Sequence, residues 1–128
     1  ALAAGGIPFE ESLVQYGDAT ADSGFELMSQ LLSLPLPPTA VFCANDRMAM
    51  GAYDAVRERG LSIPEDVAVV GFDNHEVIAA YLRPGLTSIA LPFEEMGRLA
   101  VREIAAQRAG AAARSRVVPC PMVDRHSV

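Results

Sequence analysis

Apolar positions along the chain fall into short consecutive runs and into longer stretches with helical spacing. The short runs predict strands at residues 13–16, 40–44, 67–71 and 86–89. The longer stretches predict helices between Thr20 and Pro35, from Arg47 to Arg59, from His75 to Tyr81, and around Met96 to Ile104. Residues 117–123 are extended but contain two prolines, which suits an edge strand. This alternation over short connections indicates an α/β fold, a parallel sheet flanked by helices on both faces.

The clearest helical spacing lies in the Arg47–Arg59 segment, where apolar residues recur at i, i+3, i+4 and i+7 and Gly60 provides a stop signal. The predicted buried face consists of Ala49, Ala52, Tyr53 and Val56. Residues 67–71 contain no polar interruption, which is typical of a strand buried on both faces.

Polar side chains follow three of the predicted strands. Asp18 comes after the first, Asn45 and Asp46 after the second, and Asp73 and Asn74 after the third. Because ligands of open parallel sheets bind beyond the carboxyl ends of the strands, we expect these groups to converge on one ligand. Carboxylate and carboxamide groups accept hydrogen bonds from hydroxyls, and an amide also donates, which suits a polyhydroxylated ligand such as a sugar.

Purely structural roles explain the same residues. Asp46 is well placed to cap the helix that follows it, and Asp73 with Asn74 could form a turn and a cap. The residues alone therefore leave both interpretations open, and the coincidence of three polar strand ends is what favours a ligand site.

A second group of residues is apolar but lies off the predicted core faces. Met50 is turned about 100° around the helix axis from Ala49, and Tyr81 and Leu82 belong to an apolar cluster in a short surface segment. Large apolar side chains in such places indicate a contact surface, although Met50 could instead fill a gap between helices.

Composition narrows the function. The chain has a formal net charge of -6, and all ten of its basic residues are arginines. An acidic surface repels phosphate backbones, so this chain is not expected to bind nucleic acid by itself. No apolar run is long enough to span a bilayer. The first residues lack a basic region and a long apolar stretch, so they resemble the tail of a helix rather than a signal peptide.

Candidate chemistry other than binding is sparse. Cys43 lies in an apolar run and reads as a small buried residue; a disulfide with Cys120 is the less favoured alternative. His75 and His126 have no companions at ligand spacing, so we expect no metal site and no cofactor. No nucleophile elbow, P-loop, zinc-protease or dinucleotide motif is found, which argues against an enzyme.

Three ordered segments carry a specific resemblance. They are residues 38–51 (PTAVFCANDRMAMG), residues 60–74 (GLSIPEDVAVVGFDN) and residues 84–89 (PGLTSI), and residues 122–128 (MVDRHSV) follow as a terminal motif. These segments closely resemble the lactose/galactose-repressor (LacI/GalR) family of transcriptional regulators, and the similarity covers nearly the whole chain.

The resemblance implies an architecture. Family members have an N-terminal helix-turn-helix head, a hinge, and a two-lobed sensor built like a periplasmic sugar-binding protein. Residues 1–90 would be the C-terminal lobe of that sensor, residues 91–114 would return to the first lobe, and residues 115–128 would supply a terminal strand. The helix around Met96, Leu99 and Ile104 would then pack on residues outside this chain.

The resemblance also implies site residues and partners. Asn45 and Asp73 match the family's effector contacts, and the position after Asp18, where an aromatic residue often stacks on the ligand, is Ala19. We expect a cytoplasmic, non-enzymatic effector sensor, most simply for a sugar, that forms a homodimer through Met50, Tyr81 and Leu82. Operator DNA would be bound only through the head. The main alternative is the periplasmic sugar-binding component of a transporter, and a catalytic α/β domain comes third.

Overall fold

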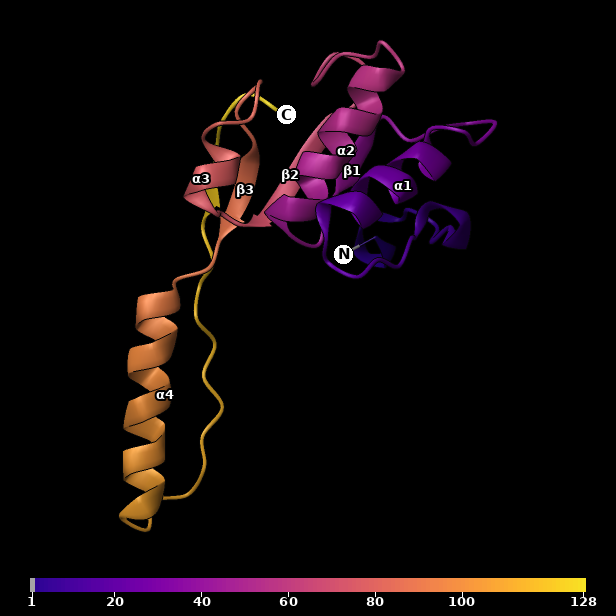
Figure 1. The fold of residues 1–128 in the computed structure, drawn as a ribbon. Coiled ribbons are helices and arrows are strands. Elements are labelled where there is room, and N and C mark those ends of the chain that lie inside the picture. The colour runs from indigo at the N-terminus through magenta and orange to yellow at the C-terminus, as the bar shows by residue number, and fades with distance from the viewer. Residues whose placement is uncertain (1) are drawn as a thin grey trace.

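The computed structural model describes residues 2–128, which form a four-stranded sheet with helices packed beside it (Figure 1). The strands are β1 (Ala40–Phe42), β2 (Ala68–Asp73), β3 (Thr87–Ala90) and β4 (Met122–Val123). They lie in the order β1-β2-β3-β4; the first three are parallel, and β4 is antiparallel to β3. The helices are α1 (Ala21–Leu31), α2 (Asp46–Glu58), α3 (Glu76–Ala79) and α4 (Phe93–Arg108), with short 3-10 turns at Ala3–Gly5 and Glu11–Leu13. The predicted α/β class is confirmed.

The core lies between the sheet and α1 and α2. The predicted buried face of α2 is confirmed, because Ala49, Ala52, Tyr53 and Val56 are each at most 2% exposed. The other buried apolar residues are Met28, Leu31, Cys43, Ala55, Val67, Val69, Ala79 and Leu86. Burial of these side chains is the main stabilising contribution to the fold, since it removes their apolar surface from water.

The α1 and α2 helices pack closely because each presents a glycine to the other. A Cβ atom on Gly24 of α1 would overlap the backbone of Met48, and one on Gly51 of α2 would overlap the carbonyl oxygen of Ala21. The absence of a side chain at both places lets the two backbones approach more closely than side chains would allow.

The two faces of the sheet differ. Val69 and Gly71 point towards α2 and are buried, and a Cβ atom on Gly71 would overlap the Asp46 carboxylate at the start of that helix. Alternation along the strand directs the intervening residues to the opposite face. There the rings of Phe42 and Phe72 meet edge to face at 6.2 Å, and Phe42 is 62% exposed.

The α4 helix extends away from the sheet, and residues 109–121 run back beside it (Figure 1). None of its residues is buried, and Phe93, Val101 and Ile104 are exposed although they are apolar. In the part of the chain that the structure covers, no helix is long and apolar enough to cross a membrane.

Two predicted strands differ from the structure. Residues 13–16 do not form a strand: Leu13 ends a 3-10 turn, and Val14 after it has an extended backbone. Leu13 and Gln15 line the same cavity as Val41 and Phe42 of β1, so they lie near the sheet without belonging to it. The predicted terminal strand is reduced to Met122–Val123, because Pro119 and Pro121 cannot donate to a ladder.

Candidate functional site

Asn45 stands at the carboxyl end of β1 and starts α2. Its backbone is extended, and its Oδ1 accepts a hydrogen bond from the Met48 N–H at 2.8 Å, so it is the N-cap of the helix. Its Nδ2 donates to the carbonyl oxygen of Ala19 at 3.1 Å. Asn45 therefore fastens the turn before α1 to the end of β1, and two predicted site residues are brought into contact.

The turn at Asp18 and Ala19 precedes α1. Asp18 is exposed and accepts hydrogen bonds from the backbone and the hydroxyl of Thr20, and these bonds hold the pKa of its carboxyl below the ordinary value. Thr20 in turn caps α1 by accepting from the Ser23 N–H. Ala19 has a φ of 68°, a left-handed conformation in which an alanine is strained.

Asp46 does not cap the helix as the sequence suggested. It is fully buried at the first position of α2 and joins three elements. Its Oδ2 accepts from the His75 N–H at 2.6 Å, and its Oδ1 accepts from the Ser88 hydroxyl at 2.6 Å. A buried carboxylate needs such partners, so this residue fixes the segment after β2 relative to α2 and β3.

Asp73 lies at the carboxyl end of β2 and is half-buried. It has a φ of 106°, and Asn74 after it has a φ of 50°, so two consecutive residues other than glycine are left-handed. Burial raises the pKa of the Asp73 carboxyl above its ordinary value, and the nearby Asp46 carboxylate raises it further. His75 and Arg47 oppose that shift. Asp73 and Asn45 follow neighbouring parallel strands, so they stand at the same edge of the sheet.

Arg125 reaches this edge from the end of the chain, and sequence reasoning missed it. Its Nη2 donates to Oδ1 of Asn74 at 2.8 Å, and its Nη1 donates to the Leu86 carbonyl oxygen at 2.6 Å. Its backbone N–H donates to the Thr87 hydroxyl at 3.0 Å. The available signal was that Arg125 is the arginine within the terminal motif at residues 122–128.

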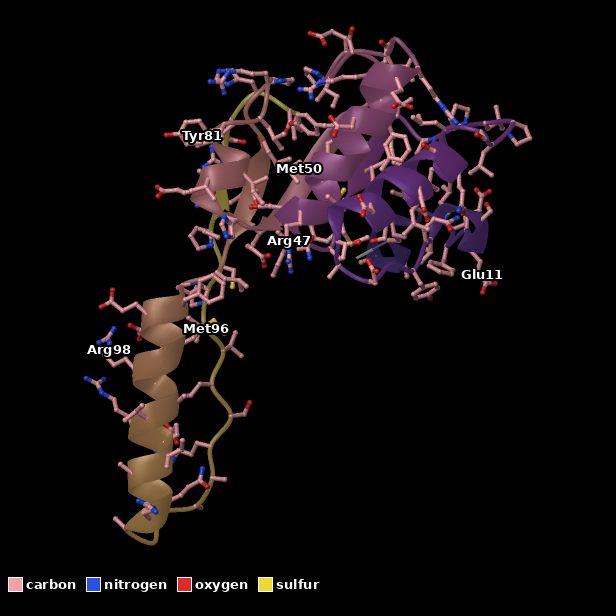
Figure 2. The ribbon with its side chains drawn as sticks, in the orientation of Figure 1. Glu11, Arg47, Met50, Tyr81, Met96 and Arg98 are labelled. Carbon is pink, nitrogen blue, oxygen red and sulfur yellow. The ribbon has the colours of Figure 1, made fainter. Side chains whose placement is uncertain are left out.

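The residues predicted for a contact surface lie elsewhere on the same lobe. Met50 is on α2 and half-buried, Leu82 is half-buried, and Tyr81, just after α3, is 73% exposed (Figure 2). The α2 helix, which carries Met50, contacts α3, the helix that precedes Tyr81 and Leu82 in the chain.

Possible metal ligands and cysteines are dispersed in the part of the chain that the structure describes. Among residues 2–128, no three His, Cys, Asp or Glu side chains are grouped so that they could hold a metal ion. Cys43 is buried, which raises the pKa of its thiol to about 12, and both Cys43 and Cys120 are free thiols. A cavity of about 330 Å³ beside β1 has a mainly apolar lining that includes Cys43, Met28 and Met48.

A mostly parallel sheet with polar groups at the carboxyl ends of two neighbouring strands is typical of α/β domains that bind small ligands. Comparison with known proteins specifies its kind. The family model of the periplasmic binding protein-like domain matches residues 1–128. The chain belongs to this family, and its relatives are regulators of the LacI type, as the resemblance indicated.

The similar proteins are named as repressors. The HTH-type transcriptional repressor CytR of Escherichia coli (strain K12) is 40% identical over 124 residues, which cover 95% of this chain and 36% of that protein. The ribose operon repressor of the same strain is 47% identical over 85 residues, covering 66% of this chain and 26% of that protein. The chain thus spans about a third of the length of the curated relatives that it matches.

Solved structures give the same result. A transcriptional regulator CelR–cellobiose complex superposes with a TM-score of 0.89 at 38% identity, covering 99% of this chain and 39% of that one. The Lac repressor bound to ONPG superposes with a TM-score of 0.85 at 32% identity, covering 99% of this chain and 38% of that one. These relatives favour the regulator over the transporter component.

Proposed function

We propose that this chain is the effector-sensing part of a cytoplasmic DNA-binding transcriptional regulator and that its effector is a sugar or a similar polar metabolite. The observation that carries the proposal is the placing of Asn45 and Asp73 on one edge of the sheet, at the carboxyl ends of β1 and β2. A relative was solved with cellobiose, and another is named for the ribose operon. Operator DNA is contacted through a head outside these residues.

The chemistry of the edge suits hydroxyl groups. The Asp73 carboxylate accepts hydrogen bonds, while Asn45 has one amide hydrogen and one lone pair left after its two structural bonds. Asp18 adds a second carboxylate, which is exposed, and Ala19 beside it has only a methyl side chain. The site makes no use of a metal or a cofactor, and we assign the chain no catalytic role.

The sensor has two lobes in this proposal, and the chain supplies residues 1–90 and 115–128 of one of them. Residues 91–114, which include α4, cross to the other lobe. The support is that α4 has no buried residue and that its apolar side chains, such as Val101 and Ile104, are exposed. Apolar side chains in such numbers on one helix need a partner surface.

We further propose that two copies of the regulator pair through Met50, Tyr81 and Leu82. Tyr81 is an exposed aromatic side chain just after α3, and aromatic and Met residues are enriched at protein interfaces. One similar solved structure is the Lac repressor dimer bound to operator.

Replacement of Asp73 tests the site. In the regulator polypeptide that carries this chain, Asp73→Ala removes an acceptor and leaves a ligand hydroxyl unpaired, at a cost of about 1–3 kcal/mol. Isothermal titration calorimetry measures the affinity of the parent and of the variant for cellobiose and for ribose, and the comparison uses the sugar that binds the parent. We expect about a 5- to 150-fold weaker affinity. Asp54→Ala, on the exposed side of α2, is the matched control, and equal affinities of the two variants would refute the assigned site.

A further inference from the structure

We propose that Arg125 is a positioning residue that orients the Asn74 side chain at the proposed effector site, so that Asn74 becomes a further ligand contact beside Asp73. The contact to ligand rests on the proposed function, whereas the action of Arg125 on the loop does not.

The loop that holds Asn74 needs outside bonds. Asp73 and Asn74 are both left-handed, a conformation that residues other than glycine keep only when their surroundings impose it. The backbone is fixed from one side: the Asn74 N–H donates to the Ser88 hydroxyl at 3.1 Å, and the His75 N–H donates to buried Asp46 at 2.6 Å. These bonds fix the main chain and do not involve the Asn74 side chain.

Arg125 fixes that side chain. Its Nη2 donates to Oδ1 of Asn74 at 2.8 Å, which determines which end of the planar amide faces the guanidinium. The Nδ2 group is then directed away from Arg125, and in the part of the chain that the structure covers it makes no hydrogen bond. Asn74 directly follows Asp73 in the chain, so we assign its free amide donor and the Asp73 carboxylate to the same ligand, since a donor together with an acceptor recognises hydroxyl groups.

Arg125 is itself held in place on several sides. Its Nη1 and its backbone N–H bond to Leu86 and Thr87 at the start of β3. Its side chain passes over Gly85, where an added Cβ atom would lie 3.2 Å from Cδ of Arg125. A guanidinium that is fixed along its stem and at its head loses little further freedom when it bonds to Asn74, so it can orient a neighbour.

The residues after Arg125 anchor the end of the chain. Ser127 is fully buried, and its hydroxyl donates to the Val69 carbonyl oxygen at 2.6 Å and accepts from the Thr87 N–H at 2.8 Å. Its carbonyl oxygen accepts from the Val69 N–H at 2.8 Å. The terminal segment is thus bonded to both β2 and β3, and Arg125 joins that segment to the loop after β2, which holds Asn74.

The first measurement needs no ligand. Hydrogen–deuterium exchange of residues 72–78 is compared in the regulator polypeptide carrying Arg125→Gln and in one carrying Arg83→Gln, an exposed arginine that bonds to carbonyl oxygens of its own turn. We expect exchange in the loop to rise about tenfold for Arg125→Gln and to stay unchanged for Arg83→Gln. Equal exchange in the two variants would overturn the proposal. Gly85→Ala, which displaces the arginine stem, should reproduce the effect if Arg125→Gln fails to fold.

The second measurement separates positioning from stability. Affinity for cellobiose or ribose is measured for Arg125→Gln, Asn74→Ala and the double variant. We expect about tenfold weaker binding for each single variant and no further loss in the double variant, because both changes remove the same oriented amide. Additive losses would show that Arg125 acts by another route and would overturn the proposal. If neither sugar binds the parent, the sugar assignment fails, and the exchange measurement still decides whether Arg125 holds the loop.

Discussion

At the scale of single residues, Asn45 and Asp46 are neighbours with similar hydrogen-bonding groups, but they have different structural roles. Asn45 caps α2 with its side chain, while Asp46 is buried and bonds to the loop after β2 and to Ser88. The sequence predicted that a polar residue would cap the helix, but it could not say which one, because both side chains accept hydrogen bonds. The outcome was decided by Gly71, whose missing side chain makes room for the Asp46 carboxylate.

Asp46→Ala should therefore be costly. It leaves the Ser88 hydroxyl and the His75 N–H without their acceptor inside the protein, and we expect the free energy of unfolding to fall by about 1–3 kcal/mol. Urea unfolding of this variant and of Asp54→Ala measures the difference. Asp54 sits on the same helix in an exposed pair with Arg57, so its replacement should cost less than about 1 kcal/mol. Similar losses in both variants would contradict the linking role of Asp46.

The raised pKa of Asp73 predicts a pH dependence. Below its unfolded pKa, near 3.8, the carboxyl is protonated in both states and contributes nothing. As the pH rises from there to the folded pKa, the folded chain retains a proton that the unfolded chain has lost, so this group lowers stability, and the loss persists at higher pH. Asp73→Asn should remove the loss, and the variant should gain stability relative to the parent between pH 3 and pH 7. An NMR titration that places the Asp73 pKa below 3.8 would refute the sign.

At the scale of elements, the sequence pattern predicted strands correctly where a segment is buried and also lies beside another strand of the sheet. Segments 40–44, 67–71 and 86–89 became strands, and the Arg47–Arg59 helix was placed within a residue of its observed bounds. The run at 13–16 was predicted as a strand but is not one, since hydropathy does not record whether a hydrogen-bonding neighbour is present.

Only part of the candidate site could be predicted from the sequence. Asn45 and Asp73 could be located because the carboxyl ends of neighbouring parallel strands meet at one edge. Arg125 could not be located, because its contact with Asn74 joins residues 51 positions apart and follows no local spacing.

The contact between α1 and α2 yields a prediction at this scale. Gly51→Ala would force a Cβ atom into the carbonyl oxygen of Ala21, so the helices must separate, and we expect a loss of about 1–3 kcal/mol in chemical unfolding. Gly97→Ala in α4 is the control. In this chain alone, its would-be Cβ has no neighbour within 4 Å outside its own helix, and an alanine in a helix interior is favoured by about 0.5–1 kcal/mol, so the helicity of the isolated chain should rise. A tolerated Gly51→Ala would show that the helices are not in tight contact in solution.

At the scale of the whole molecule, the proposed pairing through α2 and the segment after α3 can be tested directly. Met50→Glu and Tyr81→Glu place a charge where a two-fold axis brings it near its own copy, so each should shift the regulator towards monomers in sedimentation equilibrium. Arg98→Glu, a charge change at an exposed polar side chain of α4, should leave that equilibrium as in the parent (Figure 2). Parent-like sedimentation of both interface variants would place the contact elsewhere.

β1 is the first strand of the sheet, and its outer side has a consequence for handling the isolated chain. β1 pairs on one side with β2, and its residues Ala40, Val41 and Phe42 carry no charge that would repel another strand. A strand that is uncharged, has one side free of a neighbouring strand and exposes a phenylalanine can pair with a strand of another molecule. The isolated chain should therefore aggregate, and more so at higher concentration, through the strand that contains Phe42. The variant Phe42→Lys should stay in solution.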